Sequence, residues 1–434
     1  MNMKELPTIK RIGLLGPYGF GNLGDAAIQE AVIHHIKKYF PTADIFGFSL
    51  NPNDTEHRHG IKSFPIVRTS TTGSESERPE SGNGGIYKKV KTALKRIPGV
   101  NRWIPGVNRL LRHYWTVAAE GLFLSRSYKI LGGIDLLIMS GGGQLDDFWG
   151  GPWGHPYTLL KWALMAKATK TKVIFMSVGA DTIDSSLSRF FIKHSLLLAG
   201  YRSYRDDETK KLVESMGVRE GNGVYPDLAY SLPLRRDNGS PILGNEPAGI
   251  VGISPIAACA WTTSDSPIYK NYLDLLVYMA AWLLERGYRV LFFPTQTNMD
   301  TPVINDIIRR LGDRGWSGLD GKIIENRILT VDDLISQISM VEMVIASRLH
   351  SVLLSHMLHK PVLAISYNRK VNVLMADMGL SDYCIDLSQL DMDSVIEGFK
   401  SLESNKDDVV KQIASKVSCY KRALAEQYDH VFGH

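Results

Sequence analysis

The stretch that decides the fold is VIASRLHSVLLSHMLHKPVLAISYNRK, from Val344 to Lys370. An apolar run ending before Ser347 predicts a short buried strand, and Ser347 is placed to cap a helix whose apolar residues recur at helical spacing. Pro361 then starts a second apolar run over 362–365, which predicts another strand. The order strand, helix, strand is typical of a parallel α/β unit.

The turn between the first strand and the helix carries Arg348 and His350. In parallel α/β sheets, ligands bind at the turns that follow the carboxyl ends of strands. The free amides at a helix start also favour an anion. An arginine fork, an imidazole and a helix start together predict a phosphate or carboxylate site. The alternative is a capped helix with a surface arginine and a half-buried histidine.

The bulk composition bounds the class of protein. A chain of 434 residues is too long for one ordinary core, so two domains are expected, and 44% hydrophobic with 22% charged residues excludes wholesale disorder. A net charge of +5 is small for this length and does not indicate nucleic acid. The cysteines Cys259, Cys384 and Cys419 form no CxxC pair, which argues against a disulfide scaffold and a zinc site. Without a signal-peptide pattern or a membrane-length apolar run, we expect a cytoplasmic protein.

Near the N-terminus, the apolar run 11–16 predicts a strand that enters the glycine-rich turn of YGFGNLGDAAI (Tyr18–Ile28). The glycines fit GxGxxG, but Asp25 at the helix start would repel a pyrophosphate, and no ribose-binding acid follows the next strand. A dinucleotide site is therefore not expected. We expect instead that Asn22 and Asp25 face the hydroxyls of a polyol. The alternative is that Asp25 only caps the helix.

A basic insertion follows. Residues 69–85 are polar and predict a mobile loop, and residues 87–130 hold ten Lys or Arg against the single acid Glu120. Because aromatic and aliphatic residues are interleaved with these charges, the segment 87–130 can be interpreted as a contact with an anionic membrane. The interpretation that we favour is a solvated helical insertion whose apolar face packs on the domain.

Two further stretches offer candidate ligands. A buried strand over 134–139 ends in SGGGQLDDFWGGPWGHPY, where Gln144, Asp146 and Trp149 supply the polar groups and aromatic platform that suit a sugar. Its alternative is a strand-to-helix turn with packing tryptophans. Arg205, in SYRDDET, is a second candidate anion ligand, and its alternative is a salt bridge to one of the acids beside it.

The segment 234–249 is polar and rich in Pro and Gly, as linkers are, and strand–helix alternation restarts after it. We therefore predict an N-terminal Rossmann-like domain over 1–235, with the loop and basic insertion at 69–130. A linker at 236–248 leads to a C-terminal Rossmann-like domain over 249–388, and residues 389–434 form terminal helices.

Five motifs in order resemble the polysaccharide pyruvyltransferases. They are YGFGNLGDAAI (18–28), SGGGQLDD (140–147), SYRDDET (203–209), YPDLAY (225–230) and SRLHSVLLSHMLHKPVLAISYNRK (347–370). The loop and the basic insertion are not part of the family pattern. The resemblance implies two Rossmann-like domains facing a cleft, as in GT-B glycosyltransferases. It also implies transfer of pyruvate from phosphoenolpyruvate to two hydroxyls of a sugar, forming a ketal and releasing phosphate.

The resemblance maps the family's donor-binding residues onto Arg205, Arg348 and His350, and Lys370 is expected to hold charge on a substrate. From the chemistry we expect His350 to contact the phosphate and assist its departure, and Asp25 to take a proton from the acceptor. The acceptor side falls in the N-terminal domain and the phosphoenolpyruvate side in the C-terminal domain. No metal or cofactor is expected beyond the donor.

The expected partners are phosphoenolpyruvate and a sugar or lipid-linked oligosaccharide, without nucleic acid. Contact through 87–130 would place the protein at the inner face of the plasma membrane. One alternative is a nucleotide-sugar-dependent GT-B glycosyltransferase, which we disfavour because no acidic ribose ligand follows Arg348. Another is a non-catalytic glycan- or lipid-binding protein anchored by the basic segment.

Overall fold

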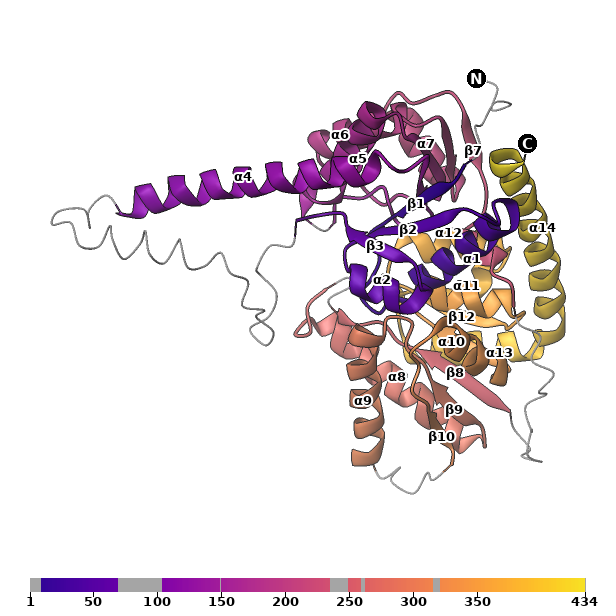
Figure 1. Ribbon diagram of the computed structural model, residues 1–434. Coiled ribbons are helices and arrows are strands. Elements are labelled where there is room, and N and C mark those ends of the chain that lie inside the picture. The colour runs from indigo at the N-terminus through magenta and orange to yellow at the C-terminus, as the bar shows by residue number, and fades with distance from the viewer. Residues whose placement is uncertain are drawn as a thin grey trace.

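The computed structural model describes residues 9–68, 104–148, 150–234, 249–258, 262–314 and 321–433, with side chains omitted over 104–117. Two parallel sheets with helices packed against them form a two-domain α/β fold (Figure 1), as the sequence predicted. The expected mobile loop and the expected linker at 236–248 lie outside the described residues. Among the described residues, no helix has the length and apolar content needed to cross a bilayer.

The first sheet has seven strands in the order β3-β2-β1-β4-β5-β6-β7. Its strands are β1 (Arg11–Leu15), β2 (Asp44–Ser49), β3 (Lys62–Pro65), β4 (Leu136–Ser140), β5 (Lys172–Val178), β6 (Tyr201–Tyr204) and β7 (Asn222–Val224). Its helices are α1 (Leu23–Tyr39), α2 (Pro52–His59), α4 (Ile104–Leu131), α5 (His155–Thr169), α6 (Ser186–Leu197) and α7 (Asp207–Ser215). Short helices are η2 (Gly151–Trp153) and η3 (Leu228–Ser231).

The second sheet has six strands in the order β10-β9-β8-β11-β12-β13. Its strands are β8 (Ile250–Ser254), β9 (Arg289–Phe292), β10 (Ile323–Glu325), β11 (Met343–Ala346), β12 (Val362–Ser366) and β13 (Cys384–Asp386). Its helices are α8 (Pro267–Glu285), α9 (Thr297–Asp313), α10 (Val331–Met340), α11 (Leu349–Met357) and α12 (Arg369–Asp377). The chain ends in α13 (Met392–Ser404) and α14 (Lys406–Phe432).

Helices cover both faces of the first sheet, which is why its central strands read as continuous apolar runs. One face packs on α4, α5 and α6 through residues such as Leu131, Trp162 and Ile192. The other face packs on α1, whose Ile28 belongs to a core that continues into the second domain. The basic insertion is thus helical over α4, which runs out from the body beyond its contact with α5 (Figure 1).

The last helix, α14, crosses back to the first domain and contacts η3 and α1 (Figure 1). Its Gln427 is fully buried and accepts a hydrogen bond from the Ser177 hydroxyl at 3.1 Å. The next residue of α14, Tyr428, stacks on His35 with ring centroids 3.9 Å apart. These buried contacts join the end of the chain to the sheet of the N-terminal domain.

One local prediction was wrong. Ser347 does not cap α11, because the cap position falls on Arg348, which makes no side-chain capping bond. The Ser347 hydroxyl instead lies 2.8 Å from the hydroxyl of Tyr272 inside the domain. The amides at the start of α11 therefore have no side-chain cap, as an anion-binding helix start requires.

Candidate functional site

The candidate site lies where the strand order of each sheet reverses. In the first sheet the reversal falls between β1 and β4, and in the second between β8 and β11. Asp25 follows β1 and Gly143 follows β4, whereas Arg348 and His350 follow β11. Open α/β sheets bind ligands at such switch points, outside the carboxyl ends of the strands. The two switch points face each other across the domain interface, as the following contacts show.

Backbone hydrogen bonds join the two domains at this point. The amide of Leu23 donates to the carbonyl of Thr295 at 2.8 Å, and the amide of Thr297 donates to the carbonyl of Gly21 at 2.9 Å. Beside this bridge the start of α1 packs against His350. A Cβ added to Gly24 would lie only 2.1 Å from Cγ of His350. The glycine at this position therefore permits the close approach of the two domains.

Asp25 is held at the start of α1 by its neighbour. Asn22, and not Asp25, caps the helix: its Oδ1 accepts from the amides of Gly24 and Asp25, and its Nδ2 donates to Asp25 Oδ2 at 2.9 Å. Burial raises the pKa of Asp25 to about 7, and the nearby Asp227 carboxylate adds to the increase. A carboxyl group with such a pKa can give and take a proton near neutral pH. The structure thus places Asn22 as the residue that orients Asp25.

Arg348 is fixed by a buried acid that the sequence analysis did not single out. Asp300, in α9, is fully buried and receives Nε and Nη2 of Arg348 at 2.6 and 2.7 Å. The same carboxylate accepts from the amide of Gln296 at 2.9 Å. On the other side of the guanidinium, Nη1 of Arg348 has no hydrogen-bond partner within the described part of the chain. A bidentate pair of this kind fixes both the position and the plane of the group.

Arg205 is held in a similar way from the other domain. Its Nη1 donates to Oδ2 of Asp227 at 3.3 Å, and its Nε lies 3.8 Å from Asp206. The Asp227 side chain is 2% exposed, and its other oxygen accepts from the amide of Ala229. The salt bridge to a neighbouring acid, expected as the alternative to an anion site, therefore exists with Asp206. Together with the bond to Asp227, it orients the guanidinium group of Arg205 at the site. Each candidate donor arginine is backed by a buried aspartate.

His350 has an unsatisfied polar atom at the centre of this group. Its Nε2 is buried and has no hydrogen-bond partner among the described residues. Burial lowers the pKa of His350 to about 4, and the charges of Asp227, Arg205, Arg348 and Lys370 act on it. The imidazole is therefore neutral at pH 7. Buried polar atoms are rarely left without a partner, so this nitrogen indicates a place for a ligand.

Lys370, at the start of α12, reaches from the second domain to the loop after β4. Its Nζ lies 3.0 Å from Asp181 and would be 3.3 Å from a Cβ on Gly143. Burial raises the pKa of Asp146, while Lys370 acts to lower it. Asp146 and Lys370 thus lie on the same side of the glycine-rich loop, next to Asp25.

The remaining residues that were predicted to bind the acceptor are Gln144 and Trp149. Gln144 is fully buried, and its Oε1 lies 2.9 Å from Nε2 of His155. Its amide therefore supports the glycine-rich loop from behind. Trp149 lies outside the described residues. The polar residues that the structure adds are Asp181, Asp227 and Asp300. Asp227 stands in the YPDLAY motif, which could have singled it out, whereas no local pattern marks Asp181 or Asp300, because each pairs with a residue far along the chain.

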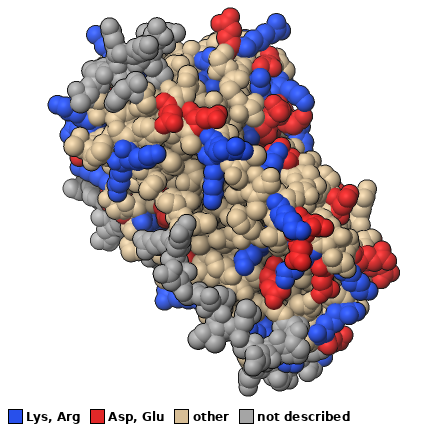
Figure 2. Space-filling view, turned by 90° about the vertical axis from the view of Figure 1, so that its right-hand side faces the viewer, with Lys and Arg blue, Asp and Glu red and all other residues tan. Residues whose placement is uncertain are grey.

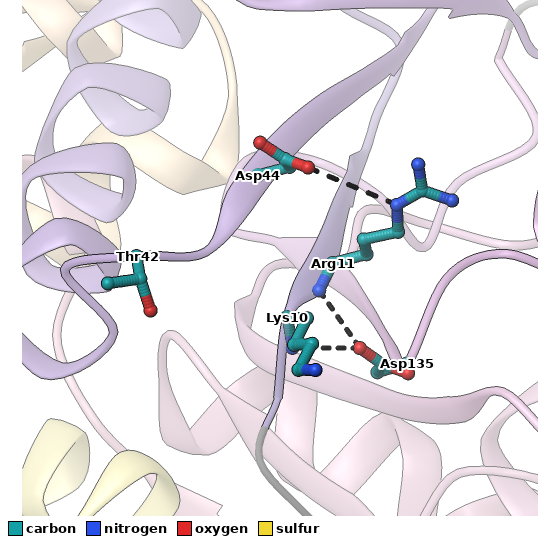
Figure 3. Close-up of a pocket in the computed structure, with 5 residues that line it drawn as sticks. All are labelled: Lys10, Arg11, Thr42, Asp44 and Asp135. Atoms are coloured by element: carbon teal, nitrogen blue, oxygen red, sulfur yellow. Dashed lines mark hydrogen bonds and ion pairs between the residues drawn. The ribbon is translucent and has the colours of Figure 1, made fainter.

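A surface hollow lies far from these residues, at the amino ends of the first sheet's strands (Figure 3). It is lined by Lys10, Arg11, Thr42, Asp44 and Asp135. The Asp135 carboxylate accepts from the backbone amides of Lys10 and Arg11 at 2.8 and 2.9 Å. This acid ties the start of β1 to the segment before β4, so the hollow has a structural explanation. In the described part of the chain, no cluster of His, Cys, Asp and Glu forms a metal site.

Comparison with solved structures agrees with a GT-B-like class of fold. A putative UDP-N-acetylglucosamine 2-epimerase from Listeria monocytogenes aligns over 98% of this chain and 97% of its own, with a TM-score of 0.57 and 12% identity. The S. aureus MnaA–UDP structure aligns over 98% and 96%, with a TM-score of 0.58 and 10% identity. At such identities the likeness concerns the fold alone.

The sequence itself identifies the family. A profile of the family described as polysaccharide pyruvyl transferase matches residues 22–369, so the chain belongs to that family. A search of curated protein sequences gives no match. The matched range contains Asn22 at its start and Arg369 at its end, and it includes every candidate residue except Lys370, which follows directly.

Proposed function

We propose that the protein transfers pyruvate from phosphoenolpyruvate to two hydroxyls of a sugar in a polysaccharide or its lipid-linked precursor. The product is a cyclic ketal, and inorganic phosphate is released. One observation carries the proposal. Arg205 and Arg348 come from opposite domains, and each is oriented by a buried aspartate. Burial and the positive charges of both arginines lower the pKa of His350, whose buried Nε2 has no hydrogen-bond partner among the described residues.

The arrangement suits the shape of the donor. Phosphoenolpyruvate carries a carboxylate and a phosphate close together, and planar guanidinium groups bind both kinds of oxyanion with paired hydrogen bonds. Two arginines fixed from opposite sides match two anionic groups better than one flexible lysine would. The start of α11 adds backbone amides that favour the phosphate. A neutral His350 offers an N–H to a phosphate oxygen without further positive charge.

The reaction needs one proton at the methylene carbon of the donor. Its addition gives cationic character at C2, which one acceptor hydroxyl attacks; the phosphate then leaves, and the neighbouring hydroxyl forms the second C–O bond. Of the two hydroxyl protons, one ends in the new methyl group and the other on phosphate. Asp25, with a pKa raised to about 7, is our candidate for the group that takes and returns a proton.

The acceptor is expected on the side of the N-terminal domain. Asp25, Asp146 and the glycines after β4 are grouped there, and Lys370 reaches them from the second domain. Carboxylates accept hydrogen bonds from sugar hydroxyls. Asn22 and Gln144 support this surface through their bonds to Asp25 and to His155.

A nucleotide-sugar transferase is the rival, since the similar MnaA structure contains UDP. Thermal unfolding with phosphoenolpyruvate or UDP-N-acetylglucosamine separates the two. The variant Arg348→Lys keeps the charge opposite Asp300 but loses the fork, and Arg309→Lys, an exposed arginine of α9, is the matched control.

A saturating ligand at about 100 times its Kd adds roughly 2.7 kcal/mol to stability. We expect phosphoenolpyruvate to raise the Tm of the wild type and of the control, and to raise that of Arg348→Lys much less. A rise with the nucleotide sugar and none with millimolar phosphoenolpyruvate would overturn the proposal. An equal rise in Arg348→Lys would overturn the place assigned to the donor.

A further inference from the structure

The layer formed by α4, α5 and α6 has an unusual charge. These three helices hold eight Lys or Arg and the single acid Glu120, a net charge of +7 (8 − 1). The whole chain carries +5, so everything outside the three helices sums to −2 (5 − 7). The structure therefore places α5, which contains no acid, beside the basic helix α4, and α6, also without an acid, beside α5.

The one acid of the layer is neutralised inside it. Glu120 lies 3.1 Å from Nζ of Lys161, which is itself buried over the ring of Phe123 at 4.7 Å. Most of the remaining described charges point to solvent: Arg126, Lys129, Lys167 and Arg189 are exposed, whereas Lys193 is half-buried. By contrast, the face shown in Figure 2 carries acidic and basic residues interspersed. The outer surface of these three helices is thus positive, because their one acid is paired inside the layer.

The same surface exposes large apolar side chains. Seven of the thirteen exposed large hydrophobic residues in the described part of the chain lie on α4, η2, α5 and α6, so this surface holds more than half of them. On α6, Leu187, Phe190 and Leu197 follow one helix face and are 39%, 50% and 51% exposed. Trp153 of η2 is 68% exposed and packs edge-on against Phe191, which joins it to α6.

We propose that the outer surface of α4, α5 and α6, called the helical layer below, docks on an anionic lipid bilayer. Surfaces that rest in the headgroup region combine Lys and Arg with Trp, Phe and Leu, which is the composition found here. A nucleic acid would use the cations but give Leu187, Phe190 and Leu197 no partner. A second copy of the chain would place +7 against +7, which like-charge repulsion opposes.

The position of the layer relative to the site is consistent with this contact. Trp153 is ten residues beyond Gly143, in the loop that leaves the glycine-rich turn after β4. A bilayer against the helical layer would bring a membrane-bound sugar to that turn. This last step rests on the proposed function, whereas docking itself does not.

Sedimentation with lipid vesicles tests the proposal without any substrate. Vesicles of phosphatidylglycerol and phosphatidylcholine are compared with phosphatidylcholine alone, at low and at high salt. The charge variant is Lys167→Glu with Arg189→Glu, and the apolar variant is Leu187→Ser with Phe190→Ser. Controls far from the layer are Lys400→Glu with Lys411→Glu, and Ile268→Ser with Tyr278→Ser, all of them exposed positions on helices.

We expect wild type and controls to bind the anionic vesicles and to be released by salt. A basic residue near such a surface contributes about fivefold to partitioning, so the charge variant should bind roughly 25-fold or more weakly. The apolar variant should also bind less. Circular dichroism and the rise in Tm with phosphoenolpyruvate show, for each variant, that the fold and the donor site are intact, so a failure of docking is distinct from a failure of the proposed function.

The proposal is overturned if the wild type does not sediment with anionic vesicles at low salt. It is also overturned if the controls lose binding as much as the layer variants do. Release of the wild type by a DNA duplex, with unchanged binding of the apolar variant, would show a general polyanion site and would likewise overturn it.

Discussion

Replacing Gly24 by alanine tests the contact between the two domains at the site. Gly24 is the second residue of α1 and its backbone is one that alanine adopts readily. Its added Cβ, however, would lie 2.1, 2.2 and 2.4 Å from Cγ, Nδ1 and Cβ of His350. Because the Cβ of the histidine is among these atoms, rotation of the ring alone does not remove the clash.

The size of the effect follows from the overlap. Ordinary contacts between such atoms begin near 3.4 Å, so the two groups must separate by more than 1 Å. Overpacking of this kind costs about 1–3 kcal/mol, which a ligand that needs the native arrangement must supply on binding. The affinity for phosphoenolpyruvate should therefore fall by about 5- to 150-fold. Helix propensity works in the opposite direction, by up to about 1 kcal/mol.

Titration calorimetry measures the affinity, and amide hydrogen exchange reports the domain contact. We expect faster exchange of the amides of Leu23 and Thr297, which donate across the interface in the wild type. Gly312→Ala in α9 is the control, because no atom lies within 4 Å of its added Cβ. If Gly24→Ala binds the donor like the wild type and exchanges no faster, the site is not assembled by this contact.

Three further predictions concern the groups around the donor. Asp300→Asn leaves the guanidinium of Arg348 buried beside a neutral amide. Denaturant titration should therefore show a loss of about 3 kcal/mol in the free energy of unfolding, and a loss below about 0.5 kcal/mol would contradict the buried pairing. In Gly179→Ala the new Cβ would lie 2.6 Å from Nη2 of Arg205, the far end of a flexible side chain. We therefore expect calorimetry to show weaker binding of phosphoenolpyruvate, with a change in the free energy of unfolding under about 1 kcal/mol. An unchanged affinity for phosphoenolpyruvate would contradict this. The pKa of Asp25 is raised to about 7 in the folded protein, so the native state binds more protons than the unfolded chain between about pH 4 and pH 7, and this contribution to stability is lost as pH rises through 7. Melting curves should therefore show Asp25→Asn gaining stability relative to wild type between about pH 4 and pH 7 and keeping that gain above pH 7, and a difference independent of pH would contradict the raised pKa.

The sequence predicted the elements whose residues carry a local signal. The central strands β1, β4, β11 and β12 are buried on both faces and read as apolar runs. The edge strands β3, β7 and β13 were not predicted, because three or four half-buried residues show no periodicity. Helix α6 was not predicted either. Its exposed residues include Leu187, Phe190 and Leu197, and its buried residues include Ser188 and Ser195, so polar and apolar residues do not separate into two faces as they do in an amphipathic helix.

The site residues likewise divide into those with a local sequence signal and those without one. Arg348 and His350 could be singled out because they follow an apolar run and start a helix. Pairing with buried acids could not be predicted for either arginine, since Asp300 lies 48 residues from Arg348 and Asp227, although part of the YPDLAY motif, lies 22 residues from Arg205. Such pairs arise only when the two sheets fix the loops in space. The pKa values of Asp25 and His350 depend on that same assembly.

The central claim is that one arginine from each domain binds a single dianionic donor. The most direct measurement is calorimetric titration of phosphoenolpyruvate into the wild type, Arg205→Lys, Arg348→Lys and the double variant. Each single variant keeps its charge and loses the planar fork, worth about 1.5–3 kcal/mol as a charged hydrogen bond. We predict that each weakens binding by roughly 10- to 150-fold, and that the double variant binds too weakly to measure. Binding at wild-type affinity in either single variant would contradict the claim.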